Sequence, residues 1–192
     1  MKRYIKADFD IEESQAFNAR EDVRALMARK TSSPELMELY LYDPSSYVRG
    51  MLAENKALPV EYFTILSTDT DWWVRKQVAS NPRTPPQILD ALSNDVYEDV
   101  RDMVAMNSSA FGSTLAKFRD GPALHRTSIA GNPSTPQDVL VKLTQDKVPN
   151  IRWEAAENIN TPLSAVIPLL NDPDREVRKS AQQALKDRGV NI

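Results

Sequence analysis

Apolar residues recur along this chain in short groups that indicate two helices in every 25 or 26 residues. One group contains a mostly β-branched residue followed by arginine and, four residues after the arginine, by alanine. The other follows a proline and has apolar residues at i, i+1 and i+4, as in Ile88, Leu89 and Leu92. Residues three and four apart share one face of a helix, so each group predicts a short amphipathic helix.

The arginines mark a repeat that other residue types keep in phase. They stand at Arg24, Arg49, Arg75, Arg101, Arg126, Arg152 and Arg178. An aspartate precedes each arginine by six residues from the second repeat onward, at Asp43, Asp69, Asp95, Asp120, Asp146 and Asp172. Asparagine follows the arginine by six residues, and proline follows it by ten in most repeats. A recurrence shared by several residue types predicts tandem structural repeats.

These positions also predict where each helix begins and ends. The aspartate is suited to cap the first helix by accepting a hydrogen bond from a free amide. The asparagine is suited to end that helix, because Asn tolerates left-handed backbone geometry. The proline, often after Ser or Thr as in Thr84-Pro85, is suited to the first turn of the second helix.

No single unit of this kind buries its apolar face alone, so neighbouring units must supply the core. We therefore expect an all-α solenoid of about seven repeats in one continuous domain, residues 1–192. Residues 1–22 would form an N-terminal cap that includes Ile5, Phe9, Ile11 and Phe17. Residues 23–176 would hold the repeats, and residues 177–192 would form the C-terminal capping helix.

With these positions laid out, the chain resembles the HEAT-like repeat proteins, and most closely the leucine-rich repeat variant family. Units of that family read roughly as Asp, Val-Arg, Ala, Asn, Pro and Leu, a pattern clearest here in residues 74–82 and 171–178. The resemblance covers nearly all of residues 18–185 and implies a right-handed superhelix. It also implies that the second helix of each unit is short and either α or 3₁₀. Such repeats identify architecture better than function.

Composition excludes several classes of site. The chain has no cysteine, which rules out disulfides, thiolate metal sites and the iron–sulfur cluster carried by one relative of that family. A net charge of -3 offers no attractive field to phosphate backbones. No stretch approaches the roughly 20 apolar residues of a membrane span, and the charged start lacks the apolar segment of a secretory signal. We expect a cytoplasmic protein without a cofactor or bound metal.

The aspartates and arginines invite a catalytic interpretation, but a pair present in nearly every unit favours architecture. We expect a structural ladder in which each Asp caps a helix and each Arg bridges to a carboxylate or carbonyl of its own or a neighbouring repeat. His125 is the only histidine, in a position otherwise held by Val or Ile. A pH-sensing or general-base role is conceivable, but that position favours a semi-buried packing residue. We expect no catalytic residues.

The residues outside the repeat pattern carry the candidate binding surface. They are the aromatic residues Tyr47, Trp72, Trp73, Tyr97 and Trp153. Tyr47 and Trp73 occupy the same position in successive repeats and would lie side by side. Trp153 occupies a position held elsewhere by small or polar residues, which predicts an exposed side chain. Exposed Trp and Tyr are typical interface anchors, although the same rings could instead cover seams between helices.

The fourth repeat, residues 100–124, departs most from the pattern. Phe111 replaces the usual proline, and Gly112 and Gly121 are added. This unit could be a bend, a hinge, a local site or a degenerate repeat.

The favoured function is a non-catalytic scaffold that binds a protein partner through the aromatic edge around Tyr47, Trp72 and Trp73. One alternative is a nucleic-acid-binding protein resembling the HEAT-like DNA glycosylases, which the acidic balance disfavours. Another is a small regulator or inhibitor of a host protein that mimics acidic surfaces, which turns such as Glu98-Asp99 permit. The sequence identifies neither the partner nor the pathway nor the oligomeric state.

Overall fold

The computed structural model describes the backbone of residues 3–4 and 11–12 and all of residues 19–190. The chain divides into two compact units, Met1–Met103 and Val104–Ile192, and each is described by itself. The side chains of Ile5, Phe9, Ile11 and Phe17, expected in an N-terminal cap, lie outside the described residues. One continuous domain over 1–192 and a right-handed superhelix stay predictions, because both concern the arrangement of the whole chain.

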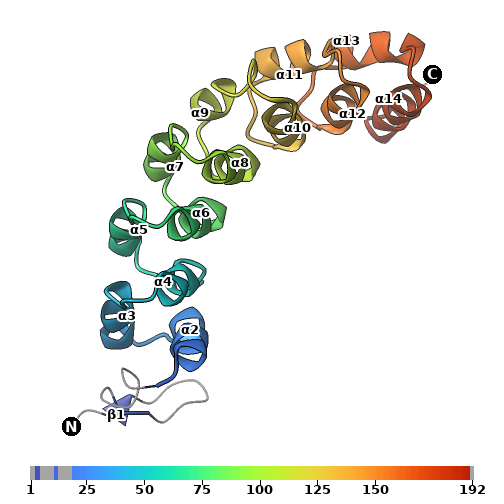
Figure 1. Cartoon of the computed structure of the whole chain (residues 1–192). Coiled ribbons are helices and arrows are strands. Elements are labelled where there is room, and N and C mark those ends of the chain that lie inside the picture. Colours follow the sequence, from blue (N-terminus) through green and yellow to red (C-terminus); the bar gives the residue numbers. More distant parts are fainter. Residues whose placement is uncertain (1–2, 5–10, 13–18, 191–192) are drawn as a thin grey trace. The chain divides into compact units, whose positions relative to one another are not determined.

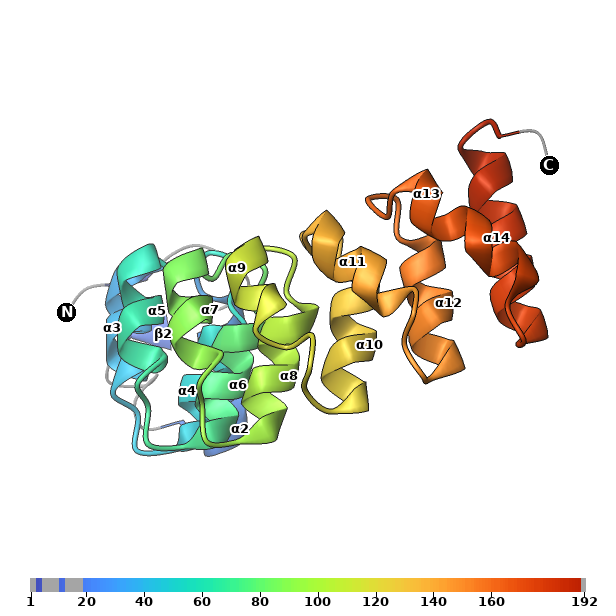
Figure 2. The same cartoon turned by 90° about the horizontal axis from the view of Figure 1, so that it is seen from above.

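In the first unit, β1 (Arg3–Tyr4) pairs antiparallel with β2 (Ile11–Glu12), and helices follow in two rows (Figures 1 and 2). We call the helix that holds the Val-Arg pair of a repeat its A helix and the helix that follows its B helix. The A helices are α2 (Glu21–Lys30), α4 (Ser46–Ala53), α6 (Trp72–Ser80) and α8 (Glu98–Met106), which contains the boundary between the units. The B helices are α3 (Pro34–Leu41), α5 (Val60–Leu66) and α7 (Pro86–Leu92).

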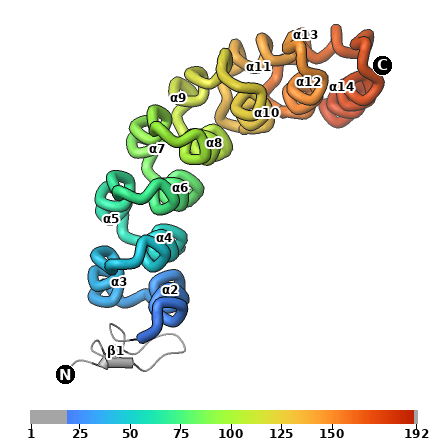
Figure 3. Tube along the Cα trace, viewed as in Figure 1, coloured from blue at the N-terminus to red at the C-terminus, as the bar shows by residue number. Residues whose placement is uncertain are grey.

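The second unit continues the same alternation, and the tube in Figure 3 follows it from helix to helix. Its A helices are α10 (Ala123–Gly131), α12 (Pro149–Glu157) and α14 (Arg175–Asp187). Its B helices are α9 (Gly112–Ala116), α11 (Gln137–Leu143) and α13 (Leu163–Val166), which passes into the 3₁₀ helix η1 (Ile167–Asn171). All regular structure in residues 19–190 is helical, which confirms the predicted all-α helical-repeat fold. The B helices in this part of the chain are α-helices, apart from the 3₁₀ turn after α13.

Each unit buries the residues that mark the repeat. In the first unit Ala53, Ala79, Val48 and Val74 are fully buried, and each A helix packs against the next one, α2 on α4 and α4 on α6. The small alanine side chain allows this close approach. Since burying apolar surface is the main favourable term in folding, every repeat depends on its neighbour for its core.

Asparagine side chains join neighbouring repeats by hydrogen bonds to backbone carbonyl groups. Asn55 Nδ2 donates to the carbonyl oxygens of Ala28 and Thr31, each at 2.8 Å, and Asn81 Nδ2 donates to Ala53 O at 2.7 Å. The Oδ1 atom of Asn81 accepts from the amide of Arg83 at 2.9 Å. Each asparagine therefore satisfies carbonyl groups left free at the end of the preceding A helix.

This arrangement corrects the expected backbone geometry of the asparagines. Asn81 has φ -72° and ψ 124°, and Asn158 has φ -61° and ψ 119°, so both are extended and not left-handed. The side chain bonds the neighbouring repeat while the main chain runs straight on toward the B helix. The prolines also differ slightly from expectation, since Pro59 and Pro85 are N-cap residues and precede the first helical turn.

The ladder aspartates do not cap the A helices as expected. Asp69 Oδ1 accepts from the amide of Asp71, two residues on, at 2.9 Å. Asp71 is the N-cap residue of α6, and its own carboxylate accepts from Trp73 N at 2.9 Å. Asp43 makes the same turn with the amide of Ser45, the N-cap residue of α4. An aspartate that bonds the amide two residues on folds a tight turn, so these residues turn the chain toward the cap.

Arg188 closes the C-terminal end of the second unit. Its Nη1 donates to Thr161 O and its Nη2 to Asn158 O, each at 2.7 Å, so its guanidinium bonds carbonyls of the preceding repeat as an asparagine does elsewhere. Gly189, with φ 76°, then ends α14. The amide of Val190 bonds Leu185 O at 2.9 Å, which completes a Schellman cap.

Among the described residues, no helix has the length and apolar character needed to cross a bilayer.

We predict that Asn81→Ala lowers the free energy of unfolding by about 1–3 kcal/mol, because it leaves the buried Ala53 carbonyl without its donor. The control is Asn94→Ala, which removes an exposed amide whose Nδ2 lies 3.4 Å from Asp90 O and should cost less than about 0.5 kcal/mol. Urea unfolding followed by circular dichroism compares the two. Equal unfolding midpoints for the two variants would show that the asparagine bonds do not hold the repeats together.

Candidate functional site

Aromatic side chains pair across successive repeats of the first unit. The ring centroids of Tyr47 on α4 and Trp73 on α6 lie 5.6 Å apart with their planes at 32°. Those of Trp72 and Tyr97 lie 5.7 Å apart at 20°, which is a stacked arrangement. The four residues thus form two neighbouring pairs, and Tyr47 and Trp73 lie side by side as their common position in the repeat implies.

Trp73 rests directly on the backbone of the preceding A helix. A Cβ atom added at Gly50 would overlap the six-membered ring of Trp73. Gly50 lies inside α4, where glycine costs roughly 0.5–1 kcal/mol relative to alanine. The position therefore holds glycine because the indole ring occupies the space of a side chain.

A polar chain holds the nitrogen of the indole. With its amide oriented to satisfy both neighbours, Gln77 accepts from Trp73 Nε1 at 3.1 Å and donates to Glu54 Oε1 at 3.3 Å. Glu54 also pairs with Arg29 Nε at 3.0 Å. The Trp73 ring is thus fixed at its face by Gly50 and at its nitrogen by Gln77, which gives it one defined orientation.

Exposed apolar residues continue this surface onto the neighbouring A helices. Tyr47 is 46% exposed and Leu26 on α2 is 43% exposed, whereas Trp73 and Met51 are half-buried. Leu26 and Met51 occupy the same position of the repeat, and Met51 lies one turn after Tyr47 on α4. We call Leu26, Tyr47, Met51 and Trp73 the A-face. It offers rigid aromatic and aliphatic groups over three consecutive helices.

The second aromatic pair is engaged by cations of the same unit. Lys76 Nζ lies 5.7 Å from the centroid of the Trp72 ring and binds Asp99 at 3.1 Å. The Arg75 guanidinium lies 5.6 Å from the centroid of Tyr97. Such contacts are worth about 0.5–1 kcal/mol at exposed sites. Trp72 and Tyr97 therefore have intramolecular cation partners that help to hold them at the edge of the A-face.

Trp153 is half-buried, and the expectation that it is exposed was wrong. It packs against a buried cluster that includes Ala156, Val177 and Ala181. Its position in the repeat is the one held by Gly50 and Ala25, both buried, and Gly50 faces the next A helix. The large side chain of Trp153 therefore fills part of the seam between α12 and α14 and is only partly accessible to solvent.

Arginines and aspartates connect neighbouring repeats within each unit. Arg49 Nε and Nη2 donate to the two carboxylate oxygens of Asp69 at 2.6 and 2.9 Å, while Nη1 donates to the carbonyl of Asp43 at 2.8 Å. Both partners of this pair are at least four-fifths buried. The same two-point ion pair joins Arg24 to Asp43, Arg75 to Asp95, Arg126 to Asp146 and Arg152 to Asp172.

Three members of the predicted ladder have other partners. Asp120 is an exposed residue that binds Lys142 Nζ at 2.5 Å and Arg119 Nε at 3.1 Å. Arg101 Nη1 donates to the carbonyls of Asp95 and Val96, and Arg178 Nη1 donates to that of Asp172. The turn around Asp120 belongs to the irregular fourth repeat, where Arg126 bonds the Gly121 carbonyl.

The glycines of that repeat allow close approaches within the second unit. A Cβ at Gly112 would lie 3.0 Å from a ring carbon of Pro136, and one at Gly121 would lie 3.2 Å from Phe118 O. Phe111, in place of the usual proline, is the N-cap residue of the five-residue helix α9. This part of the repeat is therefore a shortened unit fitted to its neighbour.

The arginines set the charge state of their aspartates. For Asp69 and Asp95 burial acts to raise the pKa, but the hydrogen bonds and charges of Arg49 and Arg75 outweigh it, and the pKa of both carboxyls lies below its ordinary value. For Asp172 the bond from Arg152 is the largest influence and lowers the pKa. These carboxylates stay ionised well into acid, as a buried pair requires.

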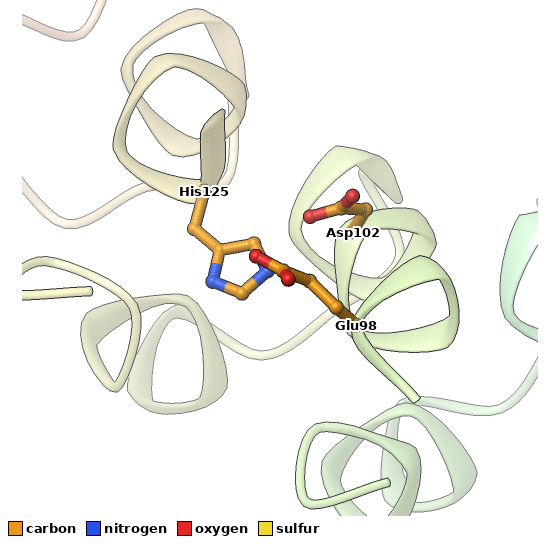
Figure 4. Close-up of side chains that lie close together, drawn as sticks. All are labelled: Glu98, Asp102 and His125. Carbon is orange, nitrogen blue, oxygen red and sulfur yellow. The ribbon is translucent and has the colours of Figure 1, made fainter. Parts of the chain in front are cut away.

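His125 is a buried residue of α10 in the second unit (Figure 4). Its ring meets the ring of Phe118 edge-on, with centroids 5.0 Å apart and planes at 62°. This environment is that of a packing histidine.

Two carboxylates of the first unit lie one turn apart on α8. They belong to Glu98, which is exposed, and Asp102, which is half-buried (Figure 4). Residues at i and i+4 share a helix face, so α8 presents both acids on one side.

Comparison with known proteins agrees with the repeat geometry. A sequence model of the family described as leucine rich repeat variant matches residues 72–96. A solved structure described as a leucine-rich repeat variant with a novel repetitive protein structural motif is 28% identical in sequence, with a TM-score of 0.63. That match covers 91% of this chain and 74% of the other. The predicted resemblance to leucine-rich repeat variant proteins is confirmed.

More distant structures add nothing to this conclusion. An engineered protein is 22% identical with a TM-score of 0.35, and the match covers 90% of this chain and 94% of that one. A designed armadillo repeat protein in complex with a (KR)4 peptide is 18% identical with a TM-score of 0.31, over 90% and 78% of the two chains. Scores this low support no argument about fold or ligand. No curated protein sequence matches this chain significantly.

We predict that acid weakens the ladder. Each ladder carboxyl with a lowered folded pKa contributes stability above its unfolded pKa of about 3.9, and this stability is lost as the pH falls from there toward the folded pKa. The free energy of unfolding of the wild-type chain should therefore fall steeply below about pH 4, whereas that of Asp95→Asn should fall less steeply. Urea titrations between about pH 5 and about pH 3 measure both slopes.

Asp138→Asn, at an exposed carboxylate of α11, is the control and should keep the wild-type slope. A wild-type slope in Asp95→Asn would contradict the prediction.

We predict that Gly50→Ala displaces the Trp73 ring. Alanine in a helix normally gains about 0.5–1 kcal/mol over glycine, but overpacking here should cost about 1–3 kcal/mol, so the variant is destabilised. Tryptophan emission should shift to the red. Gly131→Ala is the matched control, because its Cβ would meet only the movable Oε2 of Glu154 at 2.9 Å. A stabilised Gly50→Ala with unchanged emission would mean that the indole does not occupy this space.

Proposed function

We propose that this chain is a non-catalytic scaffold that binds a protein partner through the A-face of its first unit. The helical-repeat fold supports this proposal, because such folds present extended surfaces built from the positions that the repeat leaves free. The observation that carries it is the Tyr47–Trp73 pair. Its two rings are held 5.6 Å apart on neighbouring helices, and Tyr47 remains nearly half exposed.

The chemistry of the A-face suits a protein partner. Tyr and Trp supply large contact areas with few rotatable bonds, so ordering them on binding costs little entropy. Trp73 is already immobilised by Gly50 and Gln77, and pre-organisation of this kind strengthens binding without new contacts. Met51, one turn after Tyr47 on α4, and Leu26 on α2 add aliphatic surface. Hot spots of protein interfaces are enriched in such aromatic anchors.

Charge on the A-face favours a neutral apolar contact over a phosphate backbone. Glu54 is neutralised by Arg29, and Lys76 is neutralised by Asp99. The cations near the rings are therefore already engaged within the unit. Nucleic-acid binding draws its affinity from free lysine and arginine, and for this reason we favour the protein scaffold over the glycosylase-like alternative.

We predict that the double variant Leu26→Ser/Tyr47→Ser loses partners that the wild-type chain captures. Both side chains are exposed, so the fold should keep its helicity, while two apolar contacts at an interface core cost about 1–3 kcal/mol each when removed. The immobilised full chain is incubated with an extract of its native cells, and bound proteins are quantified by mass spectrometry. A partner found in this way is purified, and its dissociation constant is measured for both chains.

The control is Leu163→Ser, which removes a similarly exposed leucine from the second unit. It should retain the partner with its wild-type affinity. Equal affinity of the wild-type chain and Leu26→Ser/Tyr47→Ser for every captured protein would overturn the proposal.

A further inference from the structure

A second surface of the first unit lies on its B helices. Helices α3 and α5 are neighbours in the B row in both views (Figures 1 and 2). Their sequences, PELMELYL and VEYFTIL, contain three glutamates and no lysine, arginine or histidine. Helix α11, a B helix of the second unit, has the sequence QDVLVKL and carries both signs of charge. Helix α7, the next B helix of the first unit, has the sequence PQILDAL with one acid and no cation, so the acidic character is a feature of this unit's B helices and is not a property of B helices in general.

Apolar groups are exposed among these acids. Tyr42, the residue after α3, is 70% exposed, and Ile65 on α5 is 41% exposed. Glu38 stands four residues before Tyr42 and Glu61 four residues before Ile65, so each acid shares a face with an apolar neighbour. We call Glu38, Tyr42, Glu61, Tyr62 and Ile65 the B-face. It combines aromatic and aliphatic side chains with two carboxylates.

The charges of the B-face converge on Tyr62. The pKa of the Tyr62 hydroxyl is raised, most strongly by burial and then by the negative charges of Glu38 and Glu61. Carboxylates of two different helices therefore act on one phenol. Within residues 19–190, neither Glu38 nor Glu61 takes part in an ion pair. Beside the A-face, by contrast, Glu54 has Arg29 as its counter-charge.

From this geometry we propose that the B-face binds a protein segment in which lysine or arginine stands beside aliphatic residues. A cation there would pair with Glu38 and Glu61 and lie against the rings of Tyr42 and Tyr62, where the negative ring faces attract it. An aliphatic neighbour would cover Ile65 and the exposed side of Tyr42. Opposed charges across an interface select the partner and speed its association. Phosphate backbones and acidic segments carry the wrong sign for this surface.

The proposal does not depend on the A-face, because the two surfaces use different helices and share no residue.

The proposal is tested with a fluorescein-labelled synthetic peptide of repeated Lys-Leu-Ser units, titrated with the full chain and followed by fluorescence anisotropy. The matched probe is the same peptide with Glu in place of Lys. We expect the Lys peptide to bind, the Glu peptide not to bind, and the affinity for the Lys peptide to fall between about 50 mM and about 500 mM salt.

Variants separate the charges from the apolar contacts. Glu38→Gln/Glu61→Gln should weaken Lys-peptide binding roughly tenfold at low salt. Each of the two substitutions removes one exposed ion pair with the peptide, and the loss of one such pair should lower the affinity by about threefold. Tyr42→Ser/Ile65→Ser should weaken binding to a similar degree at both salt concentrations, because apolar contacts are not screened.

The control is Asp138→Asn/Asp187→Asn, which removes the same number of exposed carboxylates from the second unit. This control should bind the Lys peptide as the wild-type chain does. Circular dichroism confirms that all variants keep their helicity. Wild-type binding by Glu38→Gln/Glu61→Gln, or an equal loss in the control, would overturn the proposal and would show attraction by net charge only. Leu26→Ser/Tyr47→Ser should leave peptide binding unchanged, which distinguishes failure here from failure of the A-face.

Discussion

Within each unit of this chain, neighbouring repeats complete one another's polar bonding, and the other features of the fold depend on this constraint. The end of an A helix leaves carbonyl groups without partners, and the asparagine of the following repeat supplies the donor, as Asn81 does for Ala53. At the other end of the helix, an arginine such as Arg49 bonds a carbonyl of its own repeat and the carboxylate of the next. Since a buried polar group without a partner costs about 1–3 kcal/mol, a repeat without neighbours is unstable at both ends.

This constraint explains which positions repeat and which vary. The residues that bond or pack between neighbouring repeats are restricted in type, and Arg188 shows how strictly, because its guanidinium bonds the same kind of carbonyl group that an asparagine bonds in other repeats. Positions facing solvent carry no such restriction and can differ from unit to unit. The two surfaces proposed to bind partners consist of these variable positions, and for that reason they differ in chemistry although they belong to the same repeats.

The sequence predicted the architecture well, because the architecture rests on residues that recur. The positions of Pro, Asp and the Val-Arg pair located α4, α6 and α12 to within a few residues. The same pattern did not reveal what each side chain bonds. Asparagine at a helix end is compatible with a left-handed turn, and only the carbonyl of the preceding repeat explains why Asn81 is extended. Similarly, Asp69 next to a helix start resembled a cap, while the true cap is Asp71.

The candidate site was harder to predict because burial at a given position depends on the neighbouring repeat. Trp153 was expected to be exposed from the small and polar residues found at its position elsewhere, yet its ring packs against a buried cluster that includes residues of α12 and α14. Gly50 carried the signal that was missed. A glycine inside a helix, one repeat before a tryptophan, indicates that the ring lies on the backbone.

The two faces of the first unit place different demands on a partner. The A-face is apolar, its charges are neutralised within the unit, and its central ring is immobilised, so affinity there must come from shape and buried area. The B-face keeps Glu38 and Glu61 without counter-charges among the described residues, so attraction there acts over a longer range and weakens with salt. In the function proposed here, the two surfaces on the two rows of helices would hold two partners that do not compete, because each is selected by a different physical interaction. The repeat makes this possible, since the ladder and the asparagine bonds fix the helices and leave the outward positions of each row free to diverge.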